Sequence, residues 1–197
     1  MTLLKHDTRR YTYADYLKWS DGPDSELVNG TAYVREPPAP VPTHQSIVLE
    51  LGRQAASALD QTPCRVFVAP VDVLLPKSTE GDDQVDTVVQ PDVLIVSDLQ
   101  KIGARRLRGA PDWIAEVLSP NTARYDRTVK LPVYERAGVR ELWLVNPLDR
   151  TVAIYRLEEG HYGRPTLLEL KGQTPLTAVT GVIIDWDRVL AKVWFPP

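Results

Sequence analysis

The apolar positions of the chain follow helical and strand-like patterns that predict its elements. Between residues 43 and 61 they recur at helical spacing, as in one long amphipathic helix. Three later runs, rich in β-branched and large apolar residues, predict strands buried on both faces: 65–75, 87–96 and 112–119. More strands are expected over 139–147 and 151–157, and weaker ones near Leu167 and Val182. This order predicts an α/β or α+β fold in which helices pack on a sheet.

Shorter sequence patterns predict the structure of the segments between these elements. A short helix is expected over 13–19, followed by a hairpin over 26–34 that turns at an Asn-Gly pair. The proline-rich segment 36–42 predicts a stiff, extended connector. The polar, acidic stretch 76–86 lacks the ligand periodicity of a calcium loop, so we expect a solvated turn there.

A second long helix is expected after the strand at 112–119. Ser119 followed by Pro120 is typical of a helix start, and Gly138 is typical of a helix end. Pro132 lies inside this span and removes a backbone donor. We therefore expect either a kink at Pro132 or two abutting helices.

Two acidic residues interrupt the apolar runs, Asp92 in the second and Glu116 in the third. Burying an unpaired carboxylate costs several kcal/mol, so something must compensate each charge. Backbone amides or an arginine could do so for either acid alone. A third acid, Asp72, interrupts the first run in the same way, and Glu26 begins the hairpin. Several acids on one region of a sheet favour a hard divalent cation such as Mg²⁺.

A lysine on the second helix is predicted to reach the same place. Asp126 and Lys130 are spaced i,i+4 on the apolar stripe of that helix, although an ordinary helix ion pair has the same spacing. If the helix folds back over the preceding strand, about ten residues of helix rise ~15 Å, which equals four to five strand residues. Helical side chains lean toward the helix N-terminus, so the Lys130 ammonium should lie level with Glu116. His44 falls inside the stripe of the first helix.

Composition sets the remaining expectations. The 197 residues, of which 43% are hydrophobic, suit a single domain over 1–197. One cysteine excludes an internal disulfide, and no apolar run approaches the ~18 residues of a membrane span, so we expect a cytoplasmic protein without membrane contact. The net charge of −3 argues against general nucleic-acid affinity and leaves room for a local basic face. Five arginines flank the Glu116 strand and are candidates for substrate contact, although charged runs usually form a solvated face: Arg105, Arg106, Arg108, Arg124 and Arg127.

Several motifs together resemble one family. "SELVNG", "APVDVLL", "QPDVLIV", "AEVLSPNT", "YDRTVK" and "AGVRELWLVNP" are similar, in this order, to the Uma-type endonucleases of the PD-(D/E)XK restriction-endonuclease-like superfamily. The resemblance spans nearly the whole chain. It implies a mixed β-sheet flanked by helices, a Mg²⁺-dependent phosphodiesterase site that could also use Mn²⁺, nucleic acid and in particular DNA as the substrate, and a homodimer.

The resemblance also implies roles for individual residues. Asp92 and Glu116 would bind the metal with the backbone carbonyl of Val117. Glu26, His44, Asp72 and Asp126 would support the site. The superfamily places its lysine two residues after the second acid, and this chain has Leu118 there. Lys130 is the candidate for a migrated lysine.

Two other classes of function can be weighed on the same residues. An inactive nuclease fold that serves as a dimeric binding or regulatory module is favoured by the acidic net charge and by Leu118. The retained acids Asp92 and Glu116 and the inward Lys130 favour the enzyme, which is the preferred interpretation. Hydrolysis by a nucleophilic side chain is poorly supported, because Ser119 lacks the G-x-S-x-G motif and Cys64 follows Pro63 in an expected turn.

Overall fold

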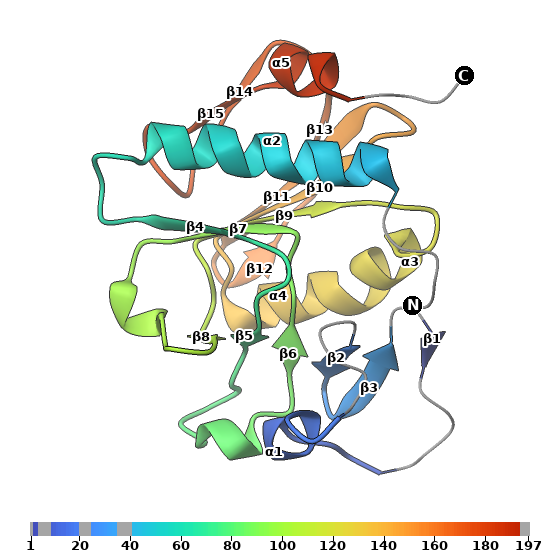
Figure 1. Ribbon diagram of the computed structural model, residues 1–197, viewed down its shortest axis with the longest axis vertical. Helices are drawn as coiled ribbons and strands as arrows, with labels where there is room; N and C mark the ends of the chain where they lie inside the picture. The colour runs from blue at the N-terminus through green and yellow to red at the C-terminus, as the bar shows by residue number, and fades with distance from the viewer. Residues whose placement is uncertain (1, 4–8, 20–24, 35–40, 194–197) are drawn as a thin grey trace.

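The fold is a layered α+β arrangement in which a helix separates two mixed sheets. The computed structural model describes residues 2–3, 9–19, 25–34 and 41–193, so most of the expected connector lies outside the described part. Figure 1 shows α2 covering one face of the larger sheet, α3 and α4 covering the other, and the smaller sheet beyond them. The helices are α1 (Tyr13–Tyr16), α2 (Pro42–Ala58), α3 (Ala123–Tyr125), α4 (Leu131–Ala137) and α5 (Trp186–Ala191).

The larger sheet has the strand order β12-β11-β10-β9-β7-β4, and β13 also pairs with β11. Strands β9 and β10 are parallel, whereas β7 pairs antiparallel with both β9 and β4. Its strands are β4 (Arg65–Val68), β7 (Val93–Val96), β9 (Trp113–Val117), β10 (Glu141–Asn146), β11 (Thr151–Glu158), β12 (His161–Tyr162) and β13 (Thr166–Glu169).

The smaller sheet has the order β1-β3-β2-β6-β5-β8, and β14 pairs with β15 separately. The expected hairpin forms β2 and β3, with Asn29 and Gly30 at positive φ in its turn. These strands are β1 (Thr2–Leu3), β2 (Ser25–Val28), β3 (Thr31–Val34), β5 (Val73–Leu74), β6 (Val88–Val89), β8 (Leu107–Arg108), β14 (Gln173–Pro175) and β15 (Ile183–Asp185).

Two of the expected strands are each divided between the two sheets, which corrects the prediction of continuous strands. Segment 65–75 supplies β4 to the larger sheet and β5 to the smaller one, and segment 87–96 supplies β6 and then β7. Pro70 and Pro91 lie at the two divisions, where a residue without an N–H cannot continue a ladder. Asp72 and Asp92 therefore lie just before β5 and β7, at the junction between the sheets.

The second long helix begins later than predicted. Ser119 makes a capping-type contact with the turn before the helix, because its Oγ accepts the Thr122 N–H over 3.2 Å and its carbonyl accepts the N–H groups of Thr122 and Ala123. The helix itself starts at Ala123. The expected interruption is a π-helical turn over Asp126–Lys130, in which Leu131 N–H donates to the Asp126 carbonyl five residues back. Gly138, at φ +90°, ends the helix as predicted.

Alternating side chains of the larger sheet fill two cores. Val93, Ala115 and Val117 face α2, whereas Leu94, Ile114 and Leu118 face α4 and the smaller sheet. Glu116 shares the second face by strand alternation. The polar groups of the candidate site therefore lie at the edge of a tightly packed interior.

Candidate active site

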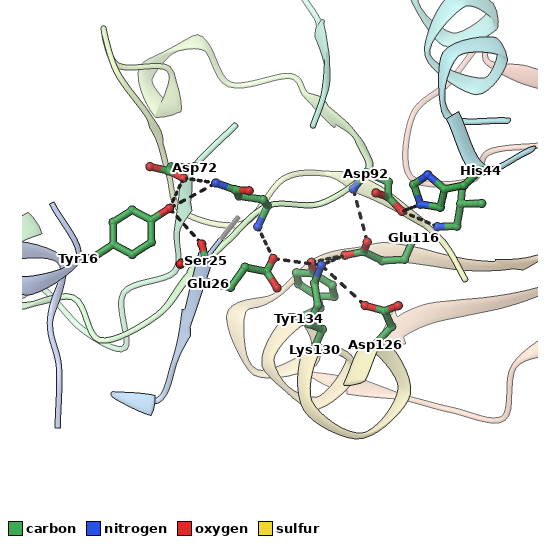
Figure 2. Close-up of polar contacts among 12 residues, drawn as sticks. Tyr16, Ser25, Glu26, His44, Asp72, Asp92, Glu116, Asp126, Lys130 and Tyr134 are labelled. Carbon is green, nitrogen blue, oxygen red and sulfur yellow. Dashed lines mark hydrogen bonds and ion pairs between the residues drawn. The ribbon is translucent and has the colours of Figure 1, made fainter. Parts of the chain in front are cut away.

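The Lys130 ammonium lies at the centre of a buried cluster of carboxylates, as Figure 2 shows. Its Nζ lies 2.5 Å from Glu116 Oε1, 3.2 Å from Glu26 Oε1 and 3.9 Å from Asp126 Oδ1. The side chain of Lys130 is only 4% exposed. The contact with Glu116 that was predicted from the rise of the helix is therefore present.

Asp126 and Lys130 lie four residues apart in the π-helical turn, on one side of the helix, and both are buried. Tyr134 follows one α-helical turn after Lys130, and its hydroxyl donates to Glu116 Oε1 over 2.5 Å. The helix thus presents two donors to one oxygen of Glu116. Leu118, at the usual lysine position, is buried in the apolar core instead.

The cluster contains more carboxyl groups than can all be ionised at neutral pH. Burial raises the pKa of Glu116 to about 8, with Lys130 opposing the rise and Asp92 adding to it. Burial likewise raises the pKa of Asp126 to about 6. Burial lowers the pKa of Lys130, but the surrounding carboxylates, Glu116 first, outweigh it and raise that pKa overall. Lys130 is therefore a permanent cation, and Glu116 retains a proton near pH 7 when no other cation is bound.

Asp92 lies beside Glu116, on the α2 side of the cluster. Its Oδ2 accepts the Val117 N–H over 2.8 Å and lies 3.1 Å from His44 Nε2. The Asp92 N–H is 3.4 Å from Glu116 Oε2, so the two acids are adjacent. Burial alone would raise the pKa of Asp92, but the hydrogen bond and charge of His44, with Lys130 and the Val117 N–H, lower it. Asp92 therefore stays ionised beside a protonated Glu116.

Asp72 and Glu26 extend the network to the opposite end, as Figure 2 shows. Gln90 donates its backbone N–H to Glu26 Oε1 over 2.6 Å and its side-chain amide to Asp72 Oδ1 over 2.9 Å. Tyr16 also donates its hydroxyl to Asp72 Oδ1, over 2.9 Å. Asp72 is thus connected to Lys130 through two residues rather than by direct contact.

Sequence reasoning missed three members of this network: Tyr16, Gln90 and Tyr134. Gln90 lies inside the "QPDVLIV" motif, and Tyr134 continues the i,i+4 series of Asp126 and Lys130. These two sequence features could have predicted Gln90 and Tyr134 as site residues. No local feature indicated Tyr16, because its partner Asp72 is 56 residues away.

The five candidate substrate arginines have different environments. Arg106 is ion-paired with Asp82, and Arg108 lies 3.3 Å from the same carboxylate and donates to the Glu80 carbonyl. Both therefore fasten the acidic stretch 76–86 to β8, and most of its residues are exposed, as expected of a solvated turn. Arg105, Arg124 and Arg127 are exposed.

The donor set fits a hard divalent cation held by few protein ligands. Among the described residues, no three His, Cys, Asp or Glu side chains are placed to hold a metal ion. Glu116 Oε1 is used by Lys130 and Tyr134, which leaves Oε2 toward Asp92. The N–H and carbonyl of one strand residue point to the same edge of the strand. The Val117 N–H points toward Asp92, beyond the last β7–β9 pair at Val93 and Ala115, so the Val117 carbonyl faces the same edge. Two carboxylates and a carbonyl, completed by water and phosphate oxygens, are a usual Mg²⁺ environment.

The layered mixed-sheet arrangement is a restriction-endonuclease-like α+β fold. The comparison with family models gives the particular family: the Uma2 model, described as "Putative restriction endonuclease", matches residues 13–187. The chain therefore belongs to the Uma2 family.

A solved structure shows the same fold. The chain is similar to a "putative nuclease belonging to DUF820" from Anabaena variabilis, with a TM-score of 0.71 and 20% identity. The match covers 91% of this chain and 97% of that chain. No curated protein matches. Within the described part of the chain, no helix has the length and apolar character needed to cross a bilayer.

Proposed function

We propose that this protein is a metal-dependent endonuclease that hydrolyses phosphodiester bonds in nucleic acid. The observation that carries the proposal is the 2.5 Å contact between Lys130 Nζ and Glu116 Oε1, with Asp92 beside them. This contact supplies, from a helix, the acid–lysine pair that the superfamily builds on one strand. A purely structural ion pair would not need the additional acid Asp92.

Asp92, Glu116 Oε2 and the Val117 carbonyl would hold Mg²⁺, or Mn²⁺ in its place. A bound divalent ion supplies phosphate polarisation and a water of lowered pKa. Around it, His44 and the Val117 N–H fix the orientation of Asp92, and Tyr134 fixes that of Glu116. These contacts keep both acids in one position before substrate arrives.

Lys130 would stabilise the negative charge that develops on the phosphate or orient the attacking water. Its place among Glu26, Asp126 and Glu116 keeps it fully protonated, so it acts as a cation and not as a base. Cation binding would displace the proton of Glu116, so that both Asp92 and Glu116 would be ionised when the ion is bound.

Calorimetric titration with Mg²⁺ and Mn²⁺ tests the proposal together with cleavage of labelled single- and double-stranded DNA and RNA. The wild type should bind the ion and cleave, whereas Asp92→Ala should lose both. Asp60→Ala is a matched control, because Asp60 is exposed and bonded only to the neighbouring Gln61 side chain among the described contacts. Equal metal binding by the wild type and Asp92→Ala would contradict the assignment.

A catalytically inactive binding or regulatory module is the second candidate. The observation that favours it is the nearly complete burial of Lys130 and Glu116, with side-chain exposures of 4% and 3%. Metal binding without cleavage of any of the four substrates would support this alternative.

DNA as the preferred substrate and a homodimer are further parts of the proposal and follow from the family resemblance. A single domain and a cytoplasmic location are also proposed, and they follow from the length and composition of the chain. Sedimentation equilibrium of the full chain would measure the assembly, and the cleavage assay would rank DNA against RNA. A monomer at all concentrations would remove the dimer from the proposal without affecting the site.

A further inference from the structure

A cleft lies on the far side of Gln90 from Lys130, and the proposed chemistry does not use it. It has a volume of about 390 Å³, within the range of ordinary small-ligand sites. Its lining combines aromatic, acidic, amide and cationic side chains, together with prolyl and aliphatic ones: Tyr16, Leu17, Trp19, Pro70, Val71, Asp72, Gln90 and Arg105.

Asp72 is held in one orientation at this cleft. Its Oδ1 accepts both the Tyr16 hydroxyl and the Gln90 amide, each over 2.9 Å. Figure 2 shows its other oxygen pointing away from both donors. Burial and then the charge of Asp72 raise the pKa of Tyr16, so its hydroxyl remains a donor. One oxygen is thus anchored and the other is available to a ligand that donates a hydrogen bond.

The aromatic wall and the arginine suit a nucleotide. The rings of Tyr16 and Trp19 meet edge to face at 5.2 Å, and Trp19 is partly exposed, unlike the fully buried Trp113 and Trp143. An exposed aromatic face can stack on a base. Arg105 is exposed on the rim and, among the described residues, has no ion pair, in contrast to Arg106.

We infer that this cleft binds one unstacked base of a single-stranded segment and selects bases that carry an exocyclic amino group. Adenine, cytosine and guanine each present an amino donor to the free oxygen of Asp72. Thymine presents carbonyl oxygens on both sides of its single N–H, and these repel a carboxylate. Trp19 stacks on the base, and Arg105 contacts a neighbouring phosphate.

This inference rests on the proposed function, because it assigns how the same protein would select its nucleic acid. Gln90 links the two places, since its side chain holds Asp72 and its backbone N–H holds Glu26, which contacts Lys130. A base in the cleft would therefore contact Asp72, which is linked through Gln90 and Glu26 to the acid–lysine cluster. A base inside a duplex cannot enter without leaving the stack.

Binding of labelled dA, dC and dT octamers in EDTA, measured by fluorescence anisotropy, tests the inference without requiring cleavage. The wild type should bind dA and dC roughly tenfold more tightly than dT, the effect of one hydrogen bond to a charged group. Asp72→Asn should reverse the order, because the new amide places a donor where the free oxygen was, and thymine can accept from it. Asp60→Asn removes the same charge from a distant exposed site and should change nothing.

Two further variants keep the test decisive if Asp72→Asn does not fold. Trp19→Leu should weaken all three octamers to a similar extent, by roughly tenfold. Arg105→Ala, at an exposed position, should weaken all three equally and lower the salt dependence by about one counterion. Equal binding of dA, dC and dT by the wild type, or no effect of Trp19→Leu and Arg105→Ala, would overturn the inference. If the wild type shows the base preference but no metal-dependent cleavage, the result would contradict the proposed function and leave the base-binding cleft supported.

Discussion

At the scale of single residues, the site depends on how one lysine neutralises several acids. Glu116, Glu26 and Asp126 all face Lys130, and Asp92 adjoins Glu116. A buried charge that loses its partner destabilises a fold strongly, whereas a neutral replacement with similar hydrogen bonds costs little. The raised pKa values of Glu116 and Asp126 therefore both contribute to the pH dependence of the metal-free protein's stability.

Replacing Glu116 with glutamine should change the pH dependence of stability. The folded protein holds the Glu116 proton up to about pH 8, whereas the unfolded chain releases it near the ordinary value of 4.5. Folding therefore favours the protonated form, and this contribution is present below pH 4.5 and is lost as the pH rises through 8. Melting of both proteins in EDTA from pH 5 to 9 should show Glu116→Gln gaining Tm relative to the wild type as the pH rises. A constant difference would mean that Glu116 is ionised throughout.

Tyr134→Phe tests the second donor to Glu116. Loss of the 2.5 Å hydrogen bond should lower the free energy of unfolding by about 1–2 kcal/mol, since the ring remains packed and only the hydroxyl is removed. Urea titration at pH 7 measures the change. A stability equal to that of the wild type would show that Lys130 alone positions Glu116.

At the scale of elements, the sequence predicted contacts better than it predicted boundaries. The contact of Lys130 with Glu116 followed from helix and strand rises, which are fixed by backbone geometry. The division of segments 65–75 and 87–96 did not, because their apolar pattern is the same in either sheet. Only Pro70 and Pro91 indicated a break, and proline is also tolerated at strand edges.

Glu141 gives an element-scale prediction, because it fastens the start of β10 to the loop before β15. Its buried carboxylate accepts the Trp143 indole N–H over 2.6 Å and the N–H groups of Thr177 and Ala178 over 2.7 and 2.8 Å. Glu141→Gln must turn an NH₂ group toward one of these donors. We expect a loss of about 2–4 kcal/mol in urea unfolding. A loss below about 0.5 kcal/mol would contradict the role of Glu141 as an anchor.

At the scale of the whole molecule, a net charge of −3 means that nucleic acid must meet local positive charge. The sequence placed five arginines near the site but could not separate free ones from paired ones, because the partner Asp82 is 24 residues from Arg106. Pairing across such a distance depends on the tertiary fold. The whole-chain motif order, by contrast, was sufficient to predict the family and the mixed α+β fold.

The two kinds of arginine should therefore respond differently to mutation. Arg127→Ala should lower the salt dependence of DNA binding by about one counterion and leave stability unchanged. Arg106→Ala should leave the salt dependence unchanged and cost about 1 kcal/mol of stability, because it breaks the pair with Asp82. Binding titrations at several salt concentrations, with urea unfolding of each variant, separate the two effects. The reverse pattern would place Arg106, and not Arg127, on the nucleic-acid face.

The central claim is that Lys130 supplies the charge that the superfamily takes from the position of Leu118. The most direct test is metal-dependent cleavage by Lys130→Met, with Mg²⁺ affinity measured in parallel. Cleavage should fall by at least about a hundredfold while metal binding persists, because the carboxylates remain. Adding Leu118→Lys should restore part of the activity, since residue 118 faces the same side of β9 as Glu116. Full activity in Lys130→Met would contradict the claim.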